Sequence, residues 1–338
     1  MAILNIPLGH GAEFDLIRRF LQNPMPVGDM ALGDSVRVGP GDDCAIVRGE
    51  NIALSVDMAV EDVHFKRAWL QPEEIGYRSV AAALSDLAAV AATPIGVLVA
   101  LAANADDADD VAASIMAGAR TAAESVGATL LGGDITRSPG PLMIDCVVVG
   151  NAIRPVLRRG ARPGDSIWVT GELGAAASAV AAWKAGREPE ASARLAFALP
   201  MPRISESLWL SSHNVVNALI DISDGLAGDI THIAAASGVR IVLDMNAIPI
   251  HPVAHMGVDD HEAALRLALS GGEDYELCFA APAGSVERLI EEFEKKFALK
   301  LTCVGTAHEG AGVSIRDFDG TARDLDVRGF NHFDGTPK

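Results

Sequence analysis

The sequence predicts a mixed α/β protein of two domains, and three observations support this. A chain of 338 residues is long for a single hydrophobic core. Strand-like and helix-like patterns alternate in both halves of the chain. Between the halves, residues 154–165 are basic and rich in proline and glycine, as is typical of a segment that joins domains. We therefore expect domains at residues 1–153 and 154–338.

In the first half, apolar and polar residues alternate from Ile52 to Met58, which predicts a half-buried strand with Ser55 and Asp57 on one face. The apolar spacing that follows predicts a helix over residues 73–92. The remaining expected elements are a buried strand at 96–102, a helix at 108–126, an apolar run at 128–131, a turn at 132–134 and a strand at 143–149.

In the second half, the same patterns predict a strand at 166–170, a helix from about 174, a strand at 218–222, a helix at 227–237 and a strand at 240–243. The turn from Gly171 to Gly174 lies between a strand and a helix. It either presents backbone amides to a phosphate at the helix N-terminus or is an ordinary loop.

Charge and cysteine usage exclude several partners and locations. With 45 acidic and 27 basic residues, the chain has a formal net charge of -18, which repels nucleic acid and anionic membranes. The alanine-rich stretch from Ser79 to Ala103 contains a charge and a proline and is not expected to span a membrane. The N-terminus lacks the pattern of a secretory signal, and the four cysteines show no C-x-x-C spacing. We therefore expect a cytoplasmic protein with reduced thiols.

Acidic residues next to glycine or other small residues indicate a metal site. They occur in four segments: Gly41-Asp42-Asp43, Ser55-Val56-Asp57, Gly133-Asp134 and Asp221-Ile222-Ser223-Asp224-Gly225. Magnesium prefers oxygen ligands and binds through a few carboxylates together with substrate phosphates. Each segment taken alone is better explained by ordinary turn chemistry, and only the four together favour a metal site.

Asp86 adds a further candidate ligand, because the helical phase places this carboxylate on the alanine-rich side of its helix. A lone buried carboxylate is costly unless a metal or another partner compensates it. The alternative for Asp86 is a cap or a solvent-facing position. The acidic run from Asp106 to Asp110 precedes a helix, where we expect it to be solvated and to carry no chemistry. The chain contains no P-loop and no dinucleotide-binding fingerprint, so any ATP site must be of another kind.

Eight longer sequence motifs are spread along the chain. They are Gly41-Asp42-Asp43-Cys44-Ala45, Ser55-Val56-Asp57, His64-Phe65, Leu84-Ser85-Asp86-Leu87-Ala88, Gly132-Gly133-Asp134, Ile220-Asp221-Ile222-Ser223-Asp224-Gly225, Leu269-Ser270-Gly271-Gly272-Glu273-Asp274-Tyr275-Glu276-Leu277 and Gly329-Phe330-Asn331-His332-Phe333. Over nearly the whole chain, these motifs resemble the thiamine-monophosphate kinase family. The resemblance implies the two-domain fold of aminoimidazole ribonucleotide synthetase. In that fold the N-terminal sheets pair into a barrel across a homodimer, and a C-terminal α/β domain completes the site.

The resemblance also implies the site residues. The magnesium ligands would be Asp43, Ser55, Asp57, Asp86, Asp134, Asp221 and Asp224. ATP, the co-substrate, would contact Gly133, Asp134, Arg158 and Ser223, while thiamine monophosphate would contact His64, Glu273 and Phe330. Val56 and Ala83 depart from residues common in the family and are left out of these sets.

The implied reaction is transfer of the γ-phosphoryl group of ATP to thiamine monophosphate by positioning and by several Mg²⁺ ions, without a protein base. Two alternatives stay open at this point. One is a related synthetase that acts on another acceptor, such as aminoimidazole ribonucleotide synthetase. The other is a protein that binds nucleotide or magnesium without turnover.

Overall fold

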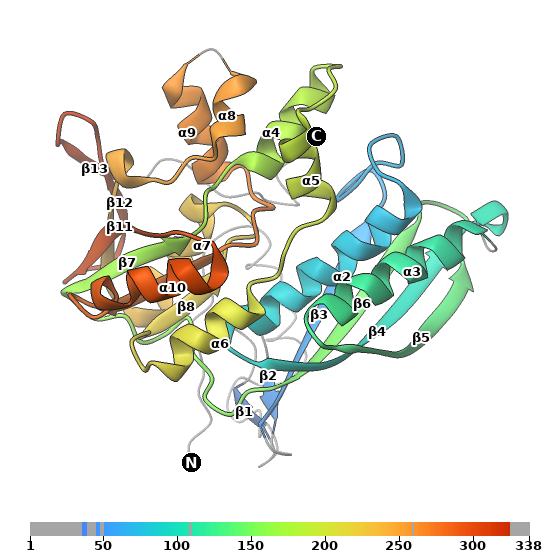
Figure 1. Cartoon of the computed structure of the whole chain (residues 1–338), viewed down its shortest axis with the longest axis horizontal. Coiled ribbons are helices and arrows are strands. Elements are labelled where there is room, and N and C mark those ends of the chain that lie inside the picture. Colours follow the sequence, from blue (N-terminus) through green and yellow to red (C-terminus); the bar gives the residue numbers. More distant parts are fainter. Residues whose placement is uncertain (1–35, 39–44, 48–50, 108–109, 259, 325–338) are drawn as a thin grey trace, which may run out of the picture.

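The computed structural model describes residues 36–38, 45–47, 51–107, 110–258 and 260–324, and these form two α/β domains with one sheet each (Figure 1). The N-terminal sheet has the strand order β1-β2-β3-β6-β4-β5. Its strands are β1 (Val36–Val38), β2 (Ala45–Val47), β3 (Ile52–Val60), β4 (Thr93–Ala103), β5 (Thr129–Arg137) and β6 (Met143–Asn151). Neighbouring strands run antiparallel except β4 and β5, which are parallel.

Two long helices, α2 (Pro72–Ala89) and α3 (Asp110–Ser125), cover one face of the N-terminal sheet (Figure 1). They pack closely because each has a glycine where the other's backbone passes. A Cβ atom on Gly118 would lie 1.8 Å from the carbonyl oxygen of Glu73, and one on Gly76 would lie 1.8 Å from that of Ile115. The backbones of the two helices are therefore in direct contact.

The other face of this sheet carries exposed apolar side chains. Val56 of β3 and Leu98 of β4 both lie opposite Val147 of β6, so the three share one face. Val56 is 62% exposed, and Met58, two residues further along β3, is 51% exposed. No described helix covers these residues, because α2 and α3 pack on the opposite face.

The C-terminal sheet has the strand order β13-β12-β9-β11-β7-β10-β8. Its strands are β7 (Asp165–Thr170), β8 (Ala218–Asp221), β9 (Arg240–Asp244), β10 (Leu277–Pro282), β11 (Leu301–His308), β12 (Gly312–Arg316) and β13 (Ala322–Asp324). The described helices of this domain are α4 (Ala175–Lys184), α5 (Ala191–Ala198), α6 (Ile204–Ser212), α7 (Leu226–Ser237), α8 (Pro252–Met256), α9 (His261–Ser270) and α10 (Ile290–Phe297).

The central strands of the C-terminal sheet are buried on both faces. Every residue of β7 is buried, and its side chains alternate between two hydrophobic clusters. Trp168 belongs to the first cluster, together with Phe279 of β10, whereas Ile167 and Val169 belong to the second. The first cluster continues into the N-terminal domain through residues of α2 such as Leu84. The two domains therefore share one core.

Most of the expected elements are found, and two expectations are wrong. Residues 132–134 do not form a turn but lie inside β5, where a β-bulge near Gly132 shifts the register against β4. A glycine is needed there, since a Cβ atom on Gly133 would lie 1.7 Å from the carbonyl oxygen of Val99. The strand expected to be buried, β4, is half exposed because helices cover only one face of its sheet.

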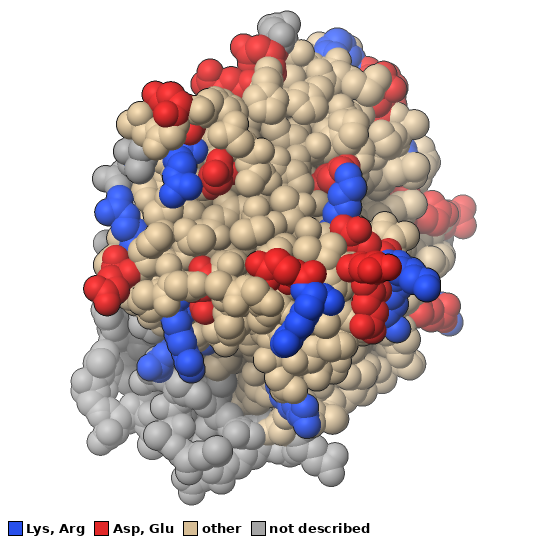
Figure 2. Space-filling model, turned by 60° about the vertical axis from the view of Figure 1, so that its left-hand side comes forward, with Lys and Arg blue, Asp and Glu red and all other residues tan. Residues whose placement is uncertain are grey.

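Two surface properties complete the description. Among the described helices, none combines the length and the apolar character needed to cross a membrane. On the face drawn in Figure 2, acidic and basic side chains are interspersed, with no continuous basic surface.

Candidate active site

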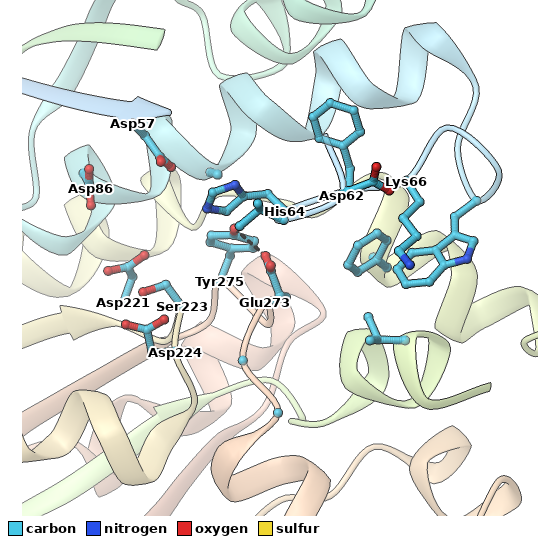
Figure 3. Close-up of a pocket in the computed structure, with 18 of the residues that line it drawn as sticks. Asp57, Asp62, His64, Lys66, Asp86, Asp221, Ser223, Asp224, Glu273 and Tyr275 are labelled. Atoms are coloured by element: carbon cyan, nitrogen blue, oxygen red, sulfur yellow. Dashed lines mark hydrogen bonds between the residues drawn. The ribbon is translucent and has the colours of Figure 1, made fainter. Parts of the chain in front are cut away.

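A pocket of about 390 Å³ lies between the two domains. The N-terminal domain contributes Asp57 from β3, His64 from the following loop and Asp86 from α2. The C-terminal domain contributes two loops, one that follows β8 and one that precedes β10. In Figure 3, Asp57, Asp86, Asp221 and Asp224 gather at one end of the pocket, and Asp62 and Lys66 lie at the other.

The carboxylates at the first end are oriented by two serine hydroxyls. The Oγ atom of Ser55 donates a hydrogen bond to Asp86 Oδ2. Directly beside Asp86 on α2, Ser85 Oγ donates to Asp221 Oδ2 over 2.6 Å. The second bond joins the two domains, because Asp221 ends strand β8. One turn of α2 thus positions carboxylates from both domains.

Asp57 has an unusual ionisation. Burial raises the pKa of its carboxyl from 3.8 to about 6, the negative charge of Glu273 adds to the increase, and the Arg78 guanidinium opposes it. The ionised form is thus disfavoured unless a cation compensates it. A bound metal ion would supply such compensation.

The two C-terminal loops at the pocket are bonded to each other and to α7. The backbone N–H groups of Ser223 and Asp224 both donate to Asp229 Oδ2, at 3.0 and 3.1 Å. The N–H of Glu273 donates to the carbonyl oxygen of Ser223 over 2.8 Å. Gly272 allows this close approach, because a Cβ atom there would lie 2.6 Å from the same carbonyl oxygen. Burial, reinforced by neighbouring carboxylates, raises the pKa of Asp229 well above its ordinary value.

The opposite end of the pocket is aromatic. Trp69 and Phe197 line it, and Trp183 stacks on Trp69 with ring centroids 4.9 Å apart and planes 7° from parallel. Phe197 contacts both tryptophans edge-on. The Nζ atom of Lys66 lies 5.2 Å from the Trp69 ring centroid. This end can accept a flat heterocycle and pack it against aromatic rings.

The residues expected from the sequence fall into three groups. Those that line the pocket are His64, Asp57, Asp86, Asp221, Ser223, Asp224 and Glu273. Ser55 contacts the pocket through Asp86, whereas Gly133 and Asp134 lie in β5 and do not line it. Arg158 also lies outside it, where its charge partly opposes the increase in the pKa of Asp229. Asp43 and Phe330 lie outside the described residues.

Two further expectations are settled by contacts. The backbone N–H of Gly174, at the start of α4, donates to both oxygens of Asp274, so the Gly171–Gly174 segment is an ordinary loop whose amide is used internally. The expectation that the acidic run from Asp106 is solvated is wrong for Asp107, which is 7% exposed. Its carboxylate is paired with Arg67 through contacts of 2.8 and 2.6 Å.

Sequence reasoning missed several residues that line the pocket or contact a residue that lines it, namely Lys66, Trp69, Arg78, Phe197, Asp229 and Tyr275. Tyr275 lies within the glycine-rich motif around Glu273, and this position could have indicated its place at the pocket. The others had no such signal, because their roles depend on contacts between segments that are far apart in the chain.

The donor set fits magnesium. In the part of the chain that the structure describes, no three histidine, cysteine or acidic side chains form a ready-made metal cage. The carboxylates at the pocket are hard oxygen donors that come from both domains. Mg²⁺ suits such an open arrangement, since it usually keeps several waters and binds through one or two carboxylates plus substrate phosphates.

Comparisons with known proteins first define the class. The family model of the AIR synthase related protein, N-terminal domain, matches residues 41–152, and that of its C-terminal domain matches residues 162–317. The thiamine-monophosphate kinase of Salmonella typhimurium is 35% identical over 337 residues, covering 95% of this chain and 98% of that protein. The Pyrococcus horikoshii enzyme of the same name is 32% identical, covering 87% and 91%. The chain belongs to the thiamine-monophosphate kinase family within the AIR synthase related proteins.

Solved structures agree with this assignment. The complex of AaThiL with AMPPCP and TMP has a TM-score of 0.80 at 28% identity, covering 98% of this chain and 100% of that one. The thiamine-monophosphate kinase of Stenotrophomonas maltophilia K279a has a TM-score of 0.73 at 32% identity, covering 94% and 98%. The HypE-HypF complex, with a TM-score of 0.69 at 18% identity, shares the fold alone.

Proposed function

We propose that this chain transfers the γ-phosphoryl group of ATP to the phosphate of thiamine monophosphate, giving thiamine diphosphate and ADP. The main support for the proposal is that the two ends of the pocket differ in chemical character. Carboxylates that suit magnesium and phosphate lie at one end, and aromatic rings that suit a flat heterocycle lie at the other. Thiamine monophosphate has the same polarity, with a phosphate at one end and two heterocycles toward the other. The names of the relatives support this acceptor over an aminoimidazole precursor.

The proposed residue roles are those that the family resemblance implies, and only some of these residues line the pocket. Magnesium would be held by Asp43, Ser55, Asp57, Asp86, Asp134, Asp221 and Asp224. When bound, it would neutralise phosphate charge and so favour the approach of two anions. ATP would contact Gly133, Asp134, Arg158 and Ser223, and the acceptor would contact His64, Glu273 and Phe330.

His64 acts as a positioning group in this proposal. Its Nδ1 atom accepts a hydrogen bond from the backbone N–H of Val60 over 3.0 Å, which assigns the proton of the neutral ring to Nε2. The ring then donates to an anionic acceptor rather than taking its proton. No base is needed, because the second ionisation of a phosphate monoester lies near pH 6 and provides the nucleophile at neutral pH.

We also propose that the protein is a cytoplasmic homodimer. The exposed apolar face of the N-terminal sheet would pair with the same face of a second copy, closing a barrel. The described cysteines, Cys146, Cys278 and Cys303, are free thiols, as expected in a reducing compartment. We propose a domain boundary between residues 153 and 154, a position that follows β6 in the chain.

The test is ADP release from ATP and Mg²⁺ with and without thiamine monophosphate. We expect release to depend on this acceptor, and equal release with aminoimidazole precursors would overturn the assignment. A pH series at constant free magnesium then tests the base-free mechanism. The value of kcat/KM for the acceptor should rise through about pH 6 in the wild type and, at a lower level, in His64→Gln. Loss of the rise in the variant alone would show that His64 accepts a proton.

A further inference from the structure

We infer that Arg78 is a positioning residue for the acceptor, which it serves by holding Glu273 at the wall of the pocket. The inference rests on the proposed function. Arg78 lies on α2 in the N-terminal domain and is only 4% exposed. Its Nη2 atom is 2.5 Å from Glu273 Oε2, and its Nη1 atom donates to the carbonyl oxygen of Phe197 over 2.7 Å. Arg78 thus connects α2 to two separate segments of the C-terminal domain.

The carboxylate of Glu273 is fixed by two donors on the same oxygen. Besides Arg78, the hydroxyl of Tyr275 donates to Oε2 over 2.7 Å. Both donors contact Oε2, and Glu273 lines the pocket between the aspartates and the aromatic end (Figure 3). We therefore expect the second oxygen, Oε1, to be the one that meets a ligand. A positively charged heterocycle such as the thiazolium of thiamine suits this position.

The backbone around Glu273 depends on support of this kind. Glu273 has φ +67° and Tyr275 has φ +51°, the left-handed region that residues other than glycine seldom adopt. Such conformations persist only where the surroundings hold them. Here the N–H of Glu273 is bonded to Ser223 and that of Tyr275 to Ile222, while Arg78 holds the side chain from the other domain.

Arg78 also fixes the distance between Glu273 and the magnesium-binding end. Arg78 and Ser85 are seven residues apart on one helix, about two turns or about 10 Å at the ordinary helical rise. At one end of this interval Arg78 holds Glu273, and at the other Ser85 holds Asp221. The helix therefore sets where the cationic end of the acceptor lies relative to its phosphate.

Phe197 provides the second contact that a positioning role requires. The guanidinium carbon of Arg78 lies 3.8 Å from the centroid of the Phe197 ring, which itself lines the aromatic end of the pocket. Arg78 therefore contacts two residues that line the pocket, the carboxylate of Glu273 and the ring of Phe197, without lining the pocket itself.

A second ion pair offers a matched control for a merely structural role. Arg194 of α5 makes a two-pronged contact with Glu74 of α2, at 2.8 and 2.7 Å. It joins the same two helices as the Arg78–Phe197 contact, but neither of its partners lines the pocket. Loss of Arg194 should therefore weaken the joint between the domains without disturbing the acceptor.

The experiment compares Arg78→Met, Arg78→Lys, Glu273→Gln and Arg194→Met in the full chain. Steady-state kinetics give kcat and KM for thiamine monophosphate and for ATP, and thermal denaturation gives Tm. We expect Arg78→Met to raise KM for thiamine monophosphate about tenfold or more, with KM for ATP unchanged. Arg78→Lys keeps the charge but cannot reach both partners, so its KM should rise by several-fold. Arg194→Met should lower Tm and leave both KM values at the wild-type level.

A double variant identifies the route of the effect. If Arg78 acts through Glu273, then Arg78→Met combined with Glu273→Gln should raise KM no further than Glu273→Gln alone. The inference is overturned if folded Arg78→Lys retains the wild-type KM, or if Arg194→Met raises KM as much as Arg78→Met does. Arg78→Lys decides the matter where Arg78→Met fails to fold. A wild-type enzyme that does not phosphorylate thiamine monophosphate would remove the proposed function, and this inference with it, whereas an active wild type with unaffected Arg78 variants removes the inference alone.

Discussion

The two sheets of this protein differ in how their faces are covered. The C-terminal sheet is enclosed by its own chain, so that all of β7 is buried between two hydrophobic clusters. The N-terminal sheet is covered on one face only, and Val56 and Met58 are more than half exposed on the other. A sheet that is covered on both faces needs no further partner. A sheet with one exposed apolar face is expected to bury that face against another surface.

This difference also separates the sources of stability. Substitutions in the C-terminal sheet should change the unfolding free energy of the chain itself. Substitutions on the exposed face of the N-terminal sheet should change association and so depend on protein concentration. Three measurements test this contrast.

The largest effect is expected from Phe279→Ala in β10. Phe279 is completely buried, so its truncation should lower the free energy of unfolding by about 3–5 kcal/mol. The loss should be the same at every protein concentration in chemical denaturation. Met58→Ala, on the exposed face, should cost about 0.5 kcal/mol or less at concentrations where the chain is monomeric. A concentration-dependent loss for Phe279→Ala would contradict the contrast.

A charge on the exposed face should break the proposed dimer. Val56→Asp would place a carboxylate from each copy in an apolar interface, and we expect the dimer dissociation constant to rise about 100-fold or more. Sedimentation velocity over a dilution series measures this change. The control is Met256→Asp, since Met256 is 66% exposed in α8 of the C-terminal domain and should leave association unchanged. A wild-type chain that is monomeric throughout would remove the interface.

The smallest effect concerns pH. Because the pKa of Asp57 is raised from 3.8 to about 6, the folded chain binds more protons than the unfolded chain between these values. Without magnesium, this group should therefore make stability fall as pH rises through that window, and Asp57→Asn should remove its contribution. The measurement is Tm against pH from 4 to 7.5 in metal-free buffer. Asp62→Asn is the control, because Asp62 is exposed at the same pocket. An unchanged slope in Asp57→Asn would show that burial does not perturb this carboxyl.

Local sequence patterns predicted much of the fold. The alternation around Asp57 and the helical phase of Asp86 placed both residues correctly on β3 and α2, because each kind of element has its own period. The alternation did not show which face of β3 is buried within the chain, since the apolar Val56 and Met58 are exposed. The glycines at 132 and 133 were misread as a turn. Glycine serves turns, bulges and close backbone contacts alike, and only the neighbouring strand shows which applies.

The site residues could be predicted only where they lie in recognisable sequence motifs. Asp221, Ser223 and Glu273 lie in such motifs, and the structure brings them to one pocket. Arg78 could not be found in this way, since its partner Phe197 is 119 residues further along the chain. Nothing in the sequence around either residue encodes that contact, which arises from the packing of α2 between the domains.

The shared hydrophobic core determines how the chain unfolds. Residues of α2 such as Leu84 lie in the same cluster as Phe279 of the C-terminal sheet, so neither domain encloses all of its apolar surface alone. Separating the domains would expose that surface to water on both sides at once. We therefore expect the two domains to unfold as one cooperative unit, in which loss of structure in either half removes the support of the other, and the pocket between them to persist only while both are folded.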